Sequence, residues 1–221
     1  MNKAVRDRLP RPEHATRFWW VRHARVPAAA DRMYGSQDLD CDTSDDALFA
    51  GIAARLPAGA IWVTSHLRRT RQTADALLAA GAAVPAARVE DPAIAEMDFG
   101  EYNGMTHAQL FAARGDDPFL GFWPMSPHDR APGGESFTIL RDRVAGFVDR
   151  ALQAYPGQDI VCSAHRGSIL AAVQIALDLP LSTSVALDID NVSLTRLTHH
   201  ADAAPDGPRW RLQECNWLPG G

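Results

Sequence analysis

Two histidines in this 221-residue chain each follow a short apolar run that has the composition of a buried strand. His23 comes directly after Arg22, and His165 ends a second such run about 140 residues later, with Arg69 at a comparable strand-to-helix passage between them. A neutral imidazole can act as a nucleophile, and arginine offers a planar set of N–H donors that matches phosphate oxygens. Phosphoryl transfer needs mainly a positioned nucleophile and surrounding positive charge. These four residues together therefore predict an enzyme that forms a phosphohistidine.

Each of these signals also has a plainer interpretation when it is taken alone. Arg22 and His23 can be a surface pair that ends a strand. Arg69 stands among neighbouring arginines that can form a solvated helix face, although the first turn of a helix also offers free backbone N–H groups to a phosphate. His165 can be a hydrogen-bonded core histidine. Their order along the chain, rather than any one residue, favours the phosphate site.

Glu96 is the candidate for a proton donor to the leaving oxygen. A carboxyl group beside that oxygen can protonate it once its surroundings favour the protonated form. Spacing alone does not select Glu96, because four further acids flank it: Glu90, Asp91, Asp98 and Glu101. Gly100 and Gly104 follow Glu96 closely and indicate that the chain turns tightly in this segment.

The elements that must position these residues alternate between strand and helix patterns. We expect helices over residues 45–56, 68–80, 105–114, 136–154 and 168–177, and strands over residues 18–21, 60–64, 88–90, 159–163, 185–189, 193–198 and 210–213. This alternation predicts an α/β fold, doubly wound, with a mainly parallel sheet and helices on both faces. Ligands of such sheets bind beyond the carboxyl ends of the strands, where the candidate residues fall.

Length and composition limit the function further. We expect residues 1–16 to form a flexible extension and residues 17–221 a single domain. A net charge of −5 without a basic stripe argues against a nucleic-acid partner. No apolar run is long enough to span a membrane and the first residues lack the apolar core of a signal peptide, so we expect a cytoplasmic protein. No metal-binding motif is present, and we expect neither metal nor cofactor; the oligomeric state is not predicted.

Taken together, five segments in order resemble the motifs of the histidine phosphatase superfamily, in its phosphoglycerate mutase-like branch. They run through most of the chain: Val21-Arg22-His23-Ala24, residues 64–74 around Arg69, residues 96–104 beginning with Glu96, Pro132-Gly133-Gly134-Glu135-Ser136, and His165-Arg166-Gly167-Ser168. The resemblance implies a phosphoglycerate mutase-like fold with a small lid insertion at about residues 105–135. It also implies that His23 is the phosphorylated nucleophile and Glu96 the proton donor. Arg22, Arg69 and His165 would complete the phosphate pocket.

The resemblance is closest to α-ribazole phosphatases and related small phosphatases, and it implies a metal-independent phosphomonoesterase acting on a small phosphorylated metabolite. Met97 replaces an arginine that mutases carry in the acid segment, which disfavours a mutase. A mutase-type phosphotransferase and a catalytically weak protein that binds phosphorylated ligands remain the alternatives. Tyr102 and Asn103 replace the Trp-Glu of the closest phosphatases, so α-ribazole phosphate as the substrate is one possibility among several.

Several departures from the family pattern fall near the expected pocket. Ala24 replaces a glycine, which is tolerable if its φ is negative. His66 replaces a proline and can add a hydrogen-bond donor near the phosphate. Arg166 replaces a glycine; its side chain either reaches a second anionic group of the substrate or is an exposed charge. In the lid, Trp123 and Arg130 are candidate substrate contacts, and the lid aromatics either stack on a ring-bearing leaving group or form a small satellite core.

Overall fold

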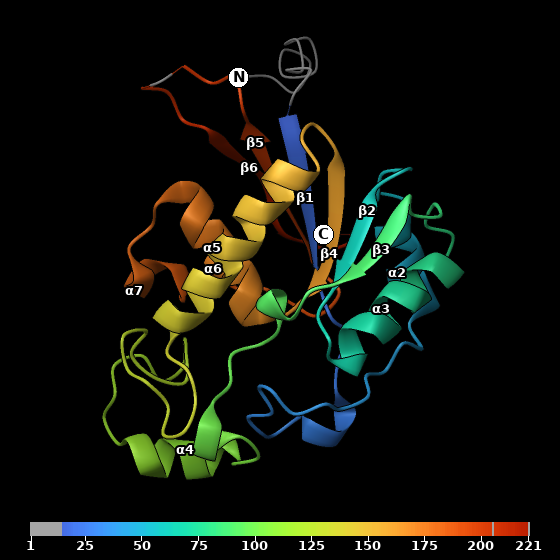
Figure 1. The fold of residues 1–221 in the computed structure, drawn as a ribbon. Coiled ribbons are helices and arrows are strands. Elements are labelled where there is room, and N and C mark those ends of the chain that lie inside the picture. Colours follow the sequence, from blue (N-terminus) through green and yellow to red (C-terminus); the bar gives the residue numbers. More distant parts are fainter. Residues whose placement is uncertain (1–14, 205, 221) are drawn as a thin grey trace.

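The computed structural model describes residues 15–204 and 206–220, which fold around one six-stranded sheet with the order β3-β2-β4-β1-β5-β6 (Figure 1). The strands are β1 (Ala15–Arg22), β2 (Ile61–Thr64), β3 (Ala87–Glu90), β4 (Asp159–Ala164), β5 (Leu194–His200) and β6 (Trp210–Trp217). The pairs β3–β2, β2–β4 and β4–β1 are parallel, whereas β5 and β6 add an antiparallel edge. The expected α/β fold with a mainly parallel sheet is confirmed.

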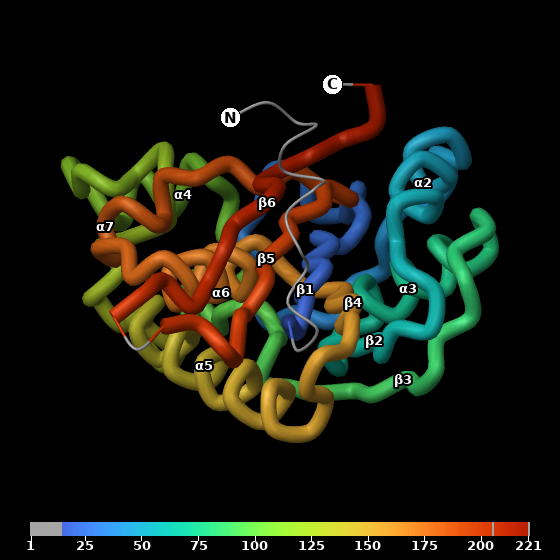
Figure 2. The backbone as a smooth tube through the Cα atoms, turned by 90° about the horizontal axis from the view of Figure 1, so that it is seen from above, coloured from blue at the N-terminus to red at the C-terminus, as the bar shows by residue number. Residues whose placement is uncertain are grey.

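The helices lie on both faces of the sheet (Figure 2). They are α2 (Asp46–Ala53), α3 (Arg68–Ala79), α4 (His107–Arg114), α5 (Phe137–Ala154), α6 (Arg166–Leu177) and α7 (Leu181–Ser184). Alternation along β1 explains the two layers, because successive strand side chains point to opposite faces. Phe18 and Trp20 are buried in the cluster that includes α5 and α6, whereas Trp19 and Val21 are buried in the cluster of α2 and α3.

Two sequence predictions need correction in the structure. Ala15 and Thr16 do not belong to an extension, because both are buried and pair with β5 at the start of β1; residues 1–14 of the predicted extension lie outside the described residues. The segment 185–189 is also not a strand. Its carbonyl groups at Val185 and Ile189 accept hydrogen bonds from arginine side chains, so they take no part in a sheet ladder.

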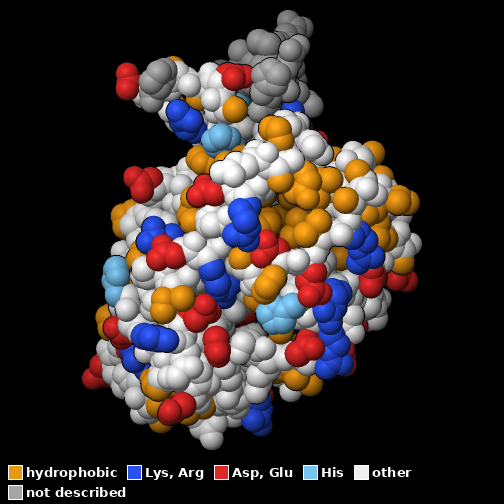
Figure 3. All heavy atoms as spheres, in the orientation of Figure 1, with side chains coloured by type: hydrophobic (Ala, Val, Ile, Leu, Met, Phe, Trp, Pro, Cys, Tyr) orange, Lys and Arg blue, Asp and Glu red, His pale blue; other side chains and the backbone are white. Residues whose placement is uncertain are grey.

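The segment from 115 to 134 is irregular, as expected, and together with α4 it lies beyond the carboxyl end of the sheet (Figure 1). Acidic and basic side chains are interspersed over the face that Figure 3 shows. Among the described residues, no helix combines the length and the apolar character that crossing a membrane requires.

Candidate active site

His23 and His165 are neighbours because β1 and β4 are neighbouring parallel strands. Arg22 pairs with Ala164 at the end of the two strands, and the backbone N–H of His23 donates to the carbonyl of Ala164 over 2.9 Å. The residue that follows each strand is a histidine, and the ring centroids of His23 and His165 lie 5.1 Å apart. The histidines are almost completely buried, with 1% and 0% of their surface exposed.

The backbone fixes the tautomer of His23. Its Nδ1 lies 2.6 Å from the carbonyl oxygen of Ala24, and because a carbonyl only accepts, Nδ1 carries the proton. Nε2 is therefore the ring atom with a free lone pair. Asn191 and Thr73 hold the turn by bonding the carbonyl of His23 and the N–H of Ala24. Burial, followed by the charges of Arg69 and Arg22, holds the pKa of His23 well below its ordinary value.

His165 has the opposite tautomer, because Arg69 Nε donates to its Nδ1 over 3.3 Å. The proton therefore stands on Nε2, which donates to Ser65 Oγ over 2.8 Å. Ser65 in turn accepts from the N–H of Leu67, at the turn that leads from β2 into α3. Burial is the main cause that holds the pKa of His165 well below its ordinary value, and the charge of Arg69 adds to it. Both imidazoles are neutral at pH 7 in this site.

Arg69 is completely buried and links His165 to the loop before α2. Its Nη1 and Nη2 donate to the carbonyls of Gln37 and Gly35, each over 2.6 Å, and its guanidinium carbon lies 5.2 Å from the ring centroid of Tyr34. Gly35 has φ +33°, and a Cβ there would lie 2.6 Å from the ring of Phe99. Only glycine therefore lets this loop approach closely enough to receive Arg69.

Arg22 is the residue of the set with the most uncommitted donors. Its Nη1 donates to the carbonyl of Ile189 over 2.6 Å, whereas its Nε is buried without a partner among the described residues. A buried, charged donor without an acceptor is costly unless a ligand supplies one. This arrangement fits an anion that binds beside His23.

Glu96 reaches the same region from a different element. Its Oε1 accepts from the N–H of Gly167, in the first turn of α6, over 3.1 Å and from its neighbour Met97 over 3.0 Å. A Cβ on Gly167 would lie 2.3 Å from Oε1, so the glycine is what allows the carboxylate to approach the start of the helix. Glu96 therefore contacts the residue two positions after His165, although 69 positions separate Glu96 from His165 in the sequence.

Arg143 of α5 fixes the backbone that carries Glu96. All five of its N–H donors are used: Nη1 donates to the carbonyls of Ala93 and Ala95, Nη2 to the carbonyl of Glu96, and Nε and Nη2 to the two carboxylate oxygens of Glu135. These distances are 2.8–2.9 Å. Glu135 also accepts from the N–H of Asp98 over 3.0 Å. We call Arg143 and Glu135 the clamp.

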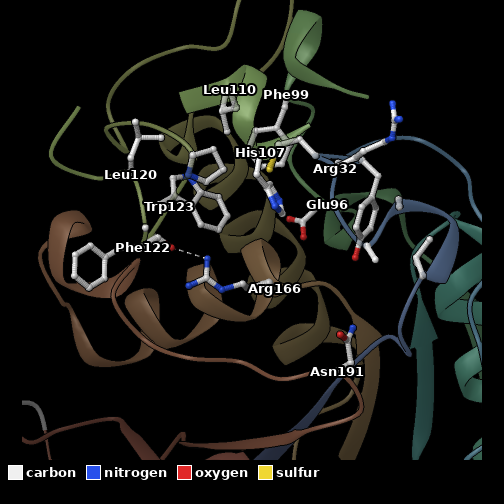
Figure 4. Close-up of a pocket in the computed structure, with 18 of the residues that line it drawn as sticks. Arg32, Glu96, Phe99, His107, Leu110, Leu120, Phe122, Trp123, Arg166 and Asn191 are labelled. Atoms are coloured by element: carbon white, nitrogen blue, oxygen red, sulfur yellow. Dashed lines mark hydrogen bonds between the residues drawn. The ribbon is translucent and has the colours of Figure 1, made fainter. Parts of the chain in front are cut away.

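A cavity of about 500 Å³ opens above these groups (Figure 4). Arg22, Glu96 and Asn191 line it together with residues of the lid. The lid lining is mainly apolar: Phe99, Leu110, Phe111, Leu120, Phe122, Trp123 and Pro124. His23, Arg69 and His165 are not among its lining residues.

Of the predicted substrate contacts, Arg166 and Trp123 line this cavity, whereas His66 and Arg130 are exposed elsewhere and do not. The backbone carbonyl of His66 accepts from Arg71, and Arg130 donates to the carbonyl of Gly134. Trp123 is only 4% exposed, because it packs against Phe137 and Phe99. Trp123 therefore belongs to the main apolar cluster and not to a separate satellite core.

Sequence reasoning missed several residues that hold this site together. Ser65 and Thr73 lie in the matched arginine segment, and Glu135 in the Pro-Gly-Gly-Glu-Ser segment, so the motifs contained a signal for them. Asn191 carried none, because no spacing rule connects a loop residue to a strand end far away. Among the described residues, no group of three or more His, Cys, Asp and Glu side chains is placed to hold a metal ion.

Comparison with known proteins agrees with this geometry. The model of the histidine phosphatase superfamily (branch 1) matches residues 18–216. A protein of Mycobacterium tuberculosis named as bifunctional is 30% identical over 193 residues, which are 86% of this chain and 52% of the relative; this chain thus spans about half of that relative. Glucosyl-3-phosphoglycerate phosphatase of the same species is 31% identical, over 91% of this chain and 95% of the relative.

Solved structures show the same similarity. The native structure of mycobacterial glucosyl-3-phosphoglycerate phosphatase superposes with a TM-score of 0.73 at 28% identity, covering 91% of this chain and 99% of that one. A putative α-ribazole-5′-P phosphatase of Escherichia coli reaches 0.72 at 19% identity, over 91% and 96% of the two chains, and shows the fold alone. With the match over residues 18–216 and the paired histidines at the strand ends, this chain belongs to branch 1 of the histidine phosphatase superfamily.

Proposed function

We propose that this protein is a metal-independent phosphomonoesterase that acts through a phosphohistidine at His23. The observation that carries the proposal is the neutral imidazole of His23, whose proton is fixed on Nδ1 and whose Nε2 is free beside Arg22, Arg69 and His165. A binding protein needs the positive charge but not the free nucleophile. Of these groups, Arg22 has a buried Nε–H without a partner among the described residues, which an anion beside His23 would satisfy.

The reaction proceeds in two steps, phosphorylation of His23 and hydrolysis of the phosphohistidine. Nε2 of His23 attacks phosphorus, an N–P bond forms, and the P–O bond to the leaving group breaks. Protonated Glu96 gives its proton to the departing oxygen, so that an alcohol leaves. In the second step water attacks the phosphohistidine, Glu96 takes a proton from that water, and inorganic phosphate is released while His23 regains its lone pair.

The surrounding groups stabilise the charge on the transferred phosphoryl group. Arg22 has uncommitted N–H donors on the cavity side, and Arg69 lies against His165. His165 must release the bond that its Nδ1 accepts from Arg69 and gain a proton there to donate to a phosphoryl oxygen, and a dianionic group next to it favours that protonation. Its Nε2–H bond to Ser65 can persist when this happens, so the ring keeps its orientation.

The substrate is a small phosphorylated metabolite, and its leaving group occupies the cavity beneath the lid. Similarity to glucosyl-3-phosphoglycerate phosphatases supports a phosphorylated metabolite with a bulky leaving group. An α-ribazole phosphate-like compound is a second candidate substrate to test. The cytoplasmic location and the absence of a nucleic-acid partner stay predictions.

The test is hydrolysis of p-nitrophenyl phosphate in EDTA, without bisphosphoglycerate, by wild type and His23→Ala. We expect turnover by wild type only, and a phosphoryl label on wild type that is labile to acid and stable to base. Label that persists on His23→Ala would assign the nucleophile elsewhere. A strict requirement for bisphosphoglycerate would indicate the mutase-type phosphotransferase instead, and binding of phosphate without turnover would indicate the binding protein.

A second experiment separates the acid from the phosphate pocket. Glu96→Gln should slow an alkyl phosphate by about 10²–10⁴-fold, because its alkoxide needs the proton, and should slow p-nitrophenyl phosphate much less. Arg69→Ala removes charge that both transition states need, so it should slow both esters by similar factors. Equal losses for both esters in Glu96→Gln would mean that Glu96 only shapes the pocket.

A further inference from the structure

A loop that precedes β5, residues 189–193, lies beside the end of β1 and extends the pairing of these two strands. The N–H of Val192 donates to the carbonyl of Arg22 over 2.9 Å, and the N–H of Arg22 donates to the carbonyl of Ser193 over 3.3 Å. Within the loop, the N–H of Ser193 donates to the carbonyl of Asp190 over 3.1 Å. The 189–193 loop therefore fixes the backbone of Arg22 on the side of β1 that faces β5.

The same loop also fixes the side chain of Arg22 and the turn that carries the nucleophile. Nη1 of Arg22 donates to the carbonyl of Ile189 over 2.6 Å. The side-chain amide of Asn191 donates to the carbonyl of His23 over 2.8 Å. A shift of the 189–193 loop would therefore move two groups at once: the guanidinium beside the proposed phosphate site and the imidazole that attacks phosphorus.

The 189–193 loop lies in no helix or strand, so contacts from outside must keep its conformation. Val192 has a φ of +59°, a left-handed conformation that a β-branched residue adopts only at a cost in free energy. Such a conformation persists where surrounding contacts fix it. Burial of the Val192 side chain, which is 2% exposed, holds one end of the loop. Asp190 at the other end is exposed and needs a different contact.

Asn216 of β6, the outer strand of the sheet (Figure 2), supplies this contact. Its Oδ1 accepts from the N–H of Asp190 over 2.6 Å, and its Nδ2 donates to the carboxylate of Asp190 over 2.9 Å. The two bonds close a ring between one side-chain amide and one residue, so they fix the orientation of Asp190 as well as its position. The backbone N–H of Asn216 donates to Thr195 Oγ1 of β5 over 3.2 Å, which ties the amide to the sheet.

A β-bulge in β6 explains how an edge strand brings this amide to the loop. Leu194 and Arg196 are two positions apart, whereas their β6 partners Trp217 and Glu214 are three positions apart. Two residues of β6 thus face one residue of β5, and a bulge of this kind redirects a side chain. Asn216 lies in the bulge with a φ of +54°, a left-handed conformation that asparagine tolerates better than most residues with a side chain.

We propose that Asn216 is a positioning residue of the phosphate pocket, which acts through Asp190 and the 189–193 loop on the guanidinium of Arg22 and the turn of His23. Asn216 is not among the lining residues of the cavity, so we assign it no contact with the substrate. The inference rests on the proposed function, because the groups that Asn216 positions are the ones that hold and attack the phosphoryl group.

Two substitutions that tolerate the left-handed backbone test this role. Asn216→Gly removes the amide, and glycine adopts a positive φ freely. Asn216→Asp keeps an acceptor for the N–H of Asp190 but places a second carboxylate against the first. We expect each variant to lower kcat/KM by about tenfold or more, and by the same factor for p-nitrophenyl phosphate and for an alkyl phosphate, because the phosphate pocket acts on both esters. The Ki of inorganic phosphate should rise in parallel.

A swapped pair and a control on the same strand separate this role from a general effect on stability. The double variant Asp190→Asn with Asn216→Asp exchanges donor and acceptor and restores the two bonds, so it should regain most of the kcat/KM that Asn216→Asp loses. Gln213→Ala is the matched control, because the side chain of Gln213 also lies on β6 but accepts from Thr198 over 2.9 Å instead of holding the loop. It should keep wild-type kinetics. Assays are run at temperatures at which circular dichroism shows each variant to be folded.

Four results would overturn the inference. One is wild-type kinetics in a folded Asn216→Gly or Asn216→Asp variant. A second is a loss in Gln213→Ala as large as that in Asn216→Gly, which would indicate a general effect of the edge strand. A third is a swapped pair no more active than Asn216→Asp, which would exclude the route through Asp190. The fourth is a loss confined to the alkyl ester, which would place the effect at Glu96. Failure of the proposed function is distinguishable, because wild type itself would then hydrolyse neither ester.

Discussion

Replacing Arg143 by lysine should destabilise the protein and also misplace the proposed acid. The guanidinium of Arg143 satisfies five acceptors at 2.8–2.9 Å, three of them backbone carbonyls on the segment from Ala93 to Glu96. A lysine ammonium offers three donors from one point and cannot reproduce the planar fork. At least two of the five acceptors would therefore lose their partner, in a partly buried position.

The expected loss of stability follows from these contacts. A neutral hydrogen bond contributes about 0.5–1.5 kcal/mol net, and one to a charged group roughly 1.5–3 kcal/mol. Loss of one bond of each kind predicts a decrease of about 2–4.5 kcal/mol in the free energy of unfolding. Arg141→Lys is the matched control, because Arg141 lies on the same helix and its one ion pair within the described part of the chain is with Asp142. That control should change stability by about 0.5 kcal/mol or less.

Urea denaturation followed by circular dichroism measures the first effect, and a pair of substrates measures the second. If the clamp positions Glu96, Arg143→Lys should slow an alkyl phosphate about tenfold more than p-nitrophenyl phosphate, because only the alkyl ester needs the acid. Equal slowing of both esters would refute the positioning role. A stability loss no larger than that of Arg141→Lys would refute the energetic argument itself.

Three further predictions concern single residues of the site. Burial and the charges of Arg69 and Arg22 lower the pKa of His23 in the folded state, so the unfolded chain binds the extra proton more readily and stability falls as pH drops through about 6.5. His23→Gln should remove part of the stability loss that urea titrations measure between about pH 7.5 and 5.5. Gly167→Ala should harm alkyl phosphates selectively in steady-state kinetics, since the new Cβ would displace the carboxylate of Glu96; a faster or unchanged rate would contradict the contact. Ser65→Ala leaves His165 Nε2 without an acceptor and should lower stability by about 1–3 kcal/mol, measured by thermal unfolding.

The fold was predictable where a local pattern determines an element. The apolar run of β1, the helical spacing of α5 and the Thr64-to-helix turn all fall close to their expected positions. The prediction of a strand over 185–189 was wrong. Val185 and Ile189 are apolar and buried, as in a strand, but their carbonyl groups accept hydrogen bonds from the side chains of Arg166 and Arg22 instead of from a neighbouring strand. Such long-range acceptors leave no trace in the local sequence.

The candidate site was predictable to the extent that topology brings strand ends together. His23 and His165 follow adjacent parallel strands, so a correct fold class already places them side by side. Glu96 follows no strand of the sheet directly, and its position depends on Arg143, Glu135 and Gly167. These three contacts join segments far apart in the chain, and only the motif order linked them beforehand. His66 and Arg130 failed as cavity residues because a position near the site in sequence does not determine which way a side chain points.

The departures from the family pattern have separate physical explanations. Ala24 has no left-handed φ, so the family's glycine is not needed for backbone freedom at this turn, and its N–H still bonds Thr73. Arg166 stands at the first position of α6, where a side chain projects toward the lid rather than into the helix–Glu96 contact, which the following Gly167 preserves. A glycine at 166 would leave the carbonyls of Phe122, Val185 and Leu187 without this donor. The substitution thus joins the lid to the loop after α7, and it leaves the approach of Glu96 to the start of α6 intact because Gly167, not residue 166, makes that contact.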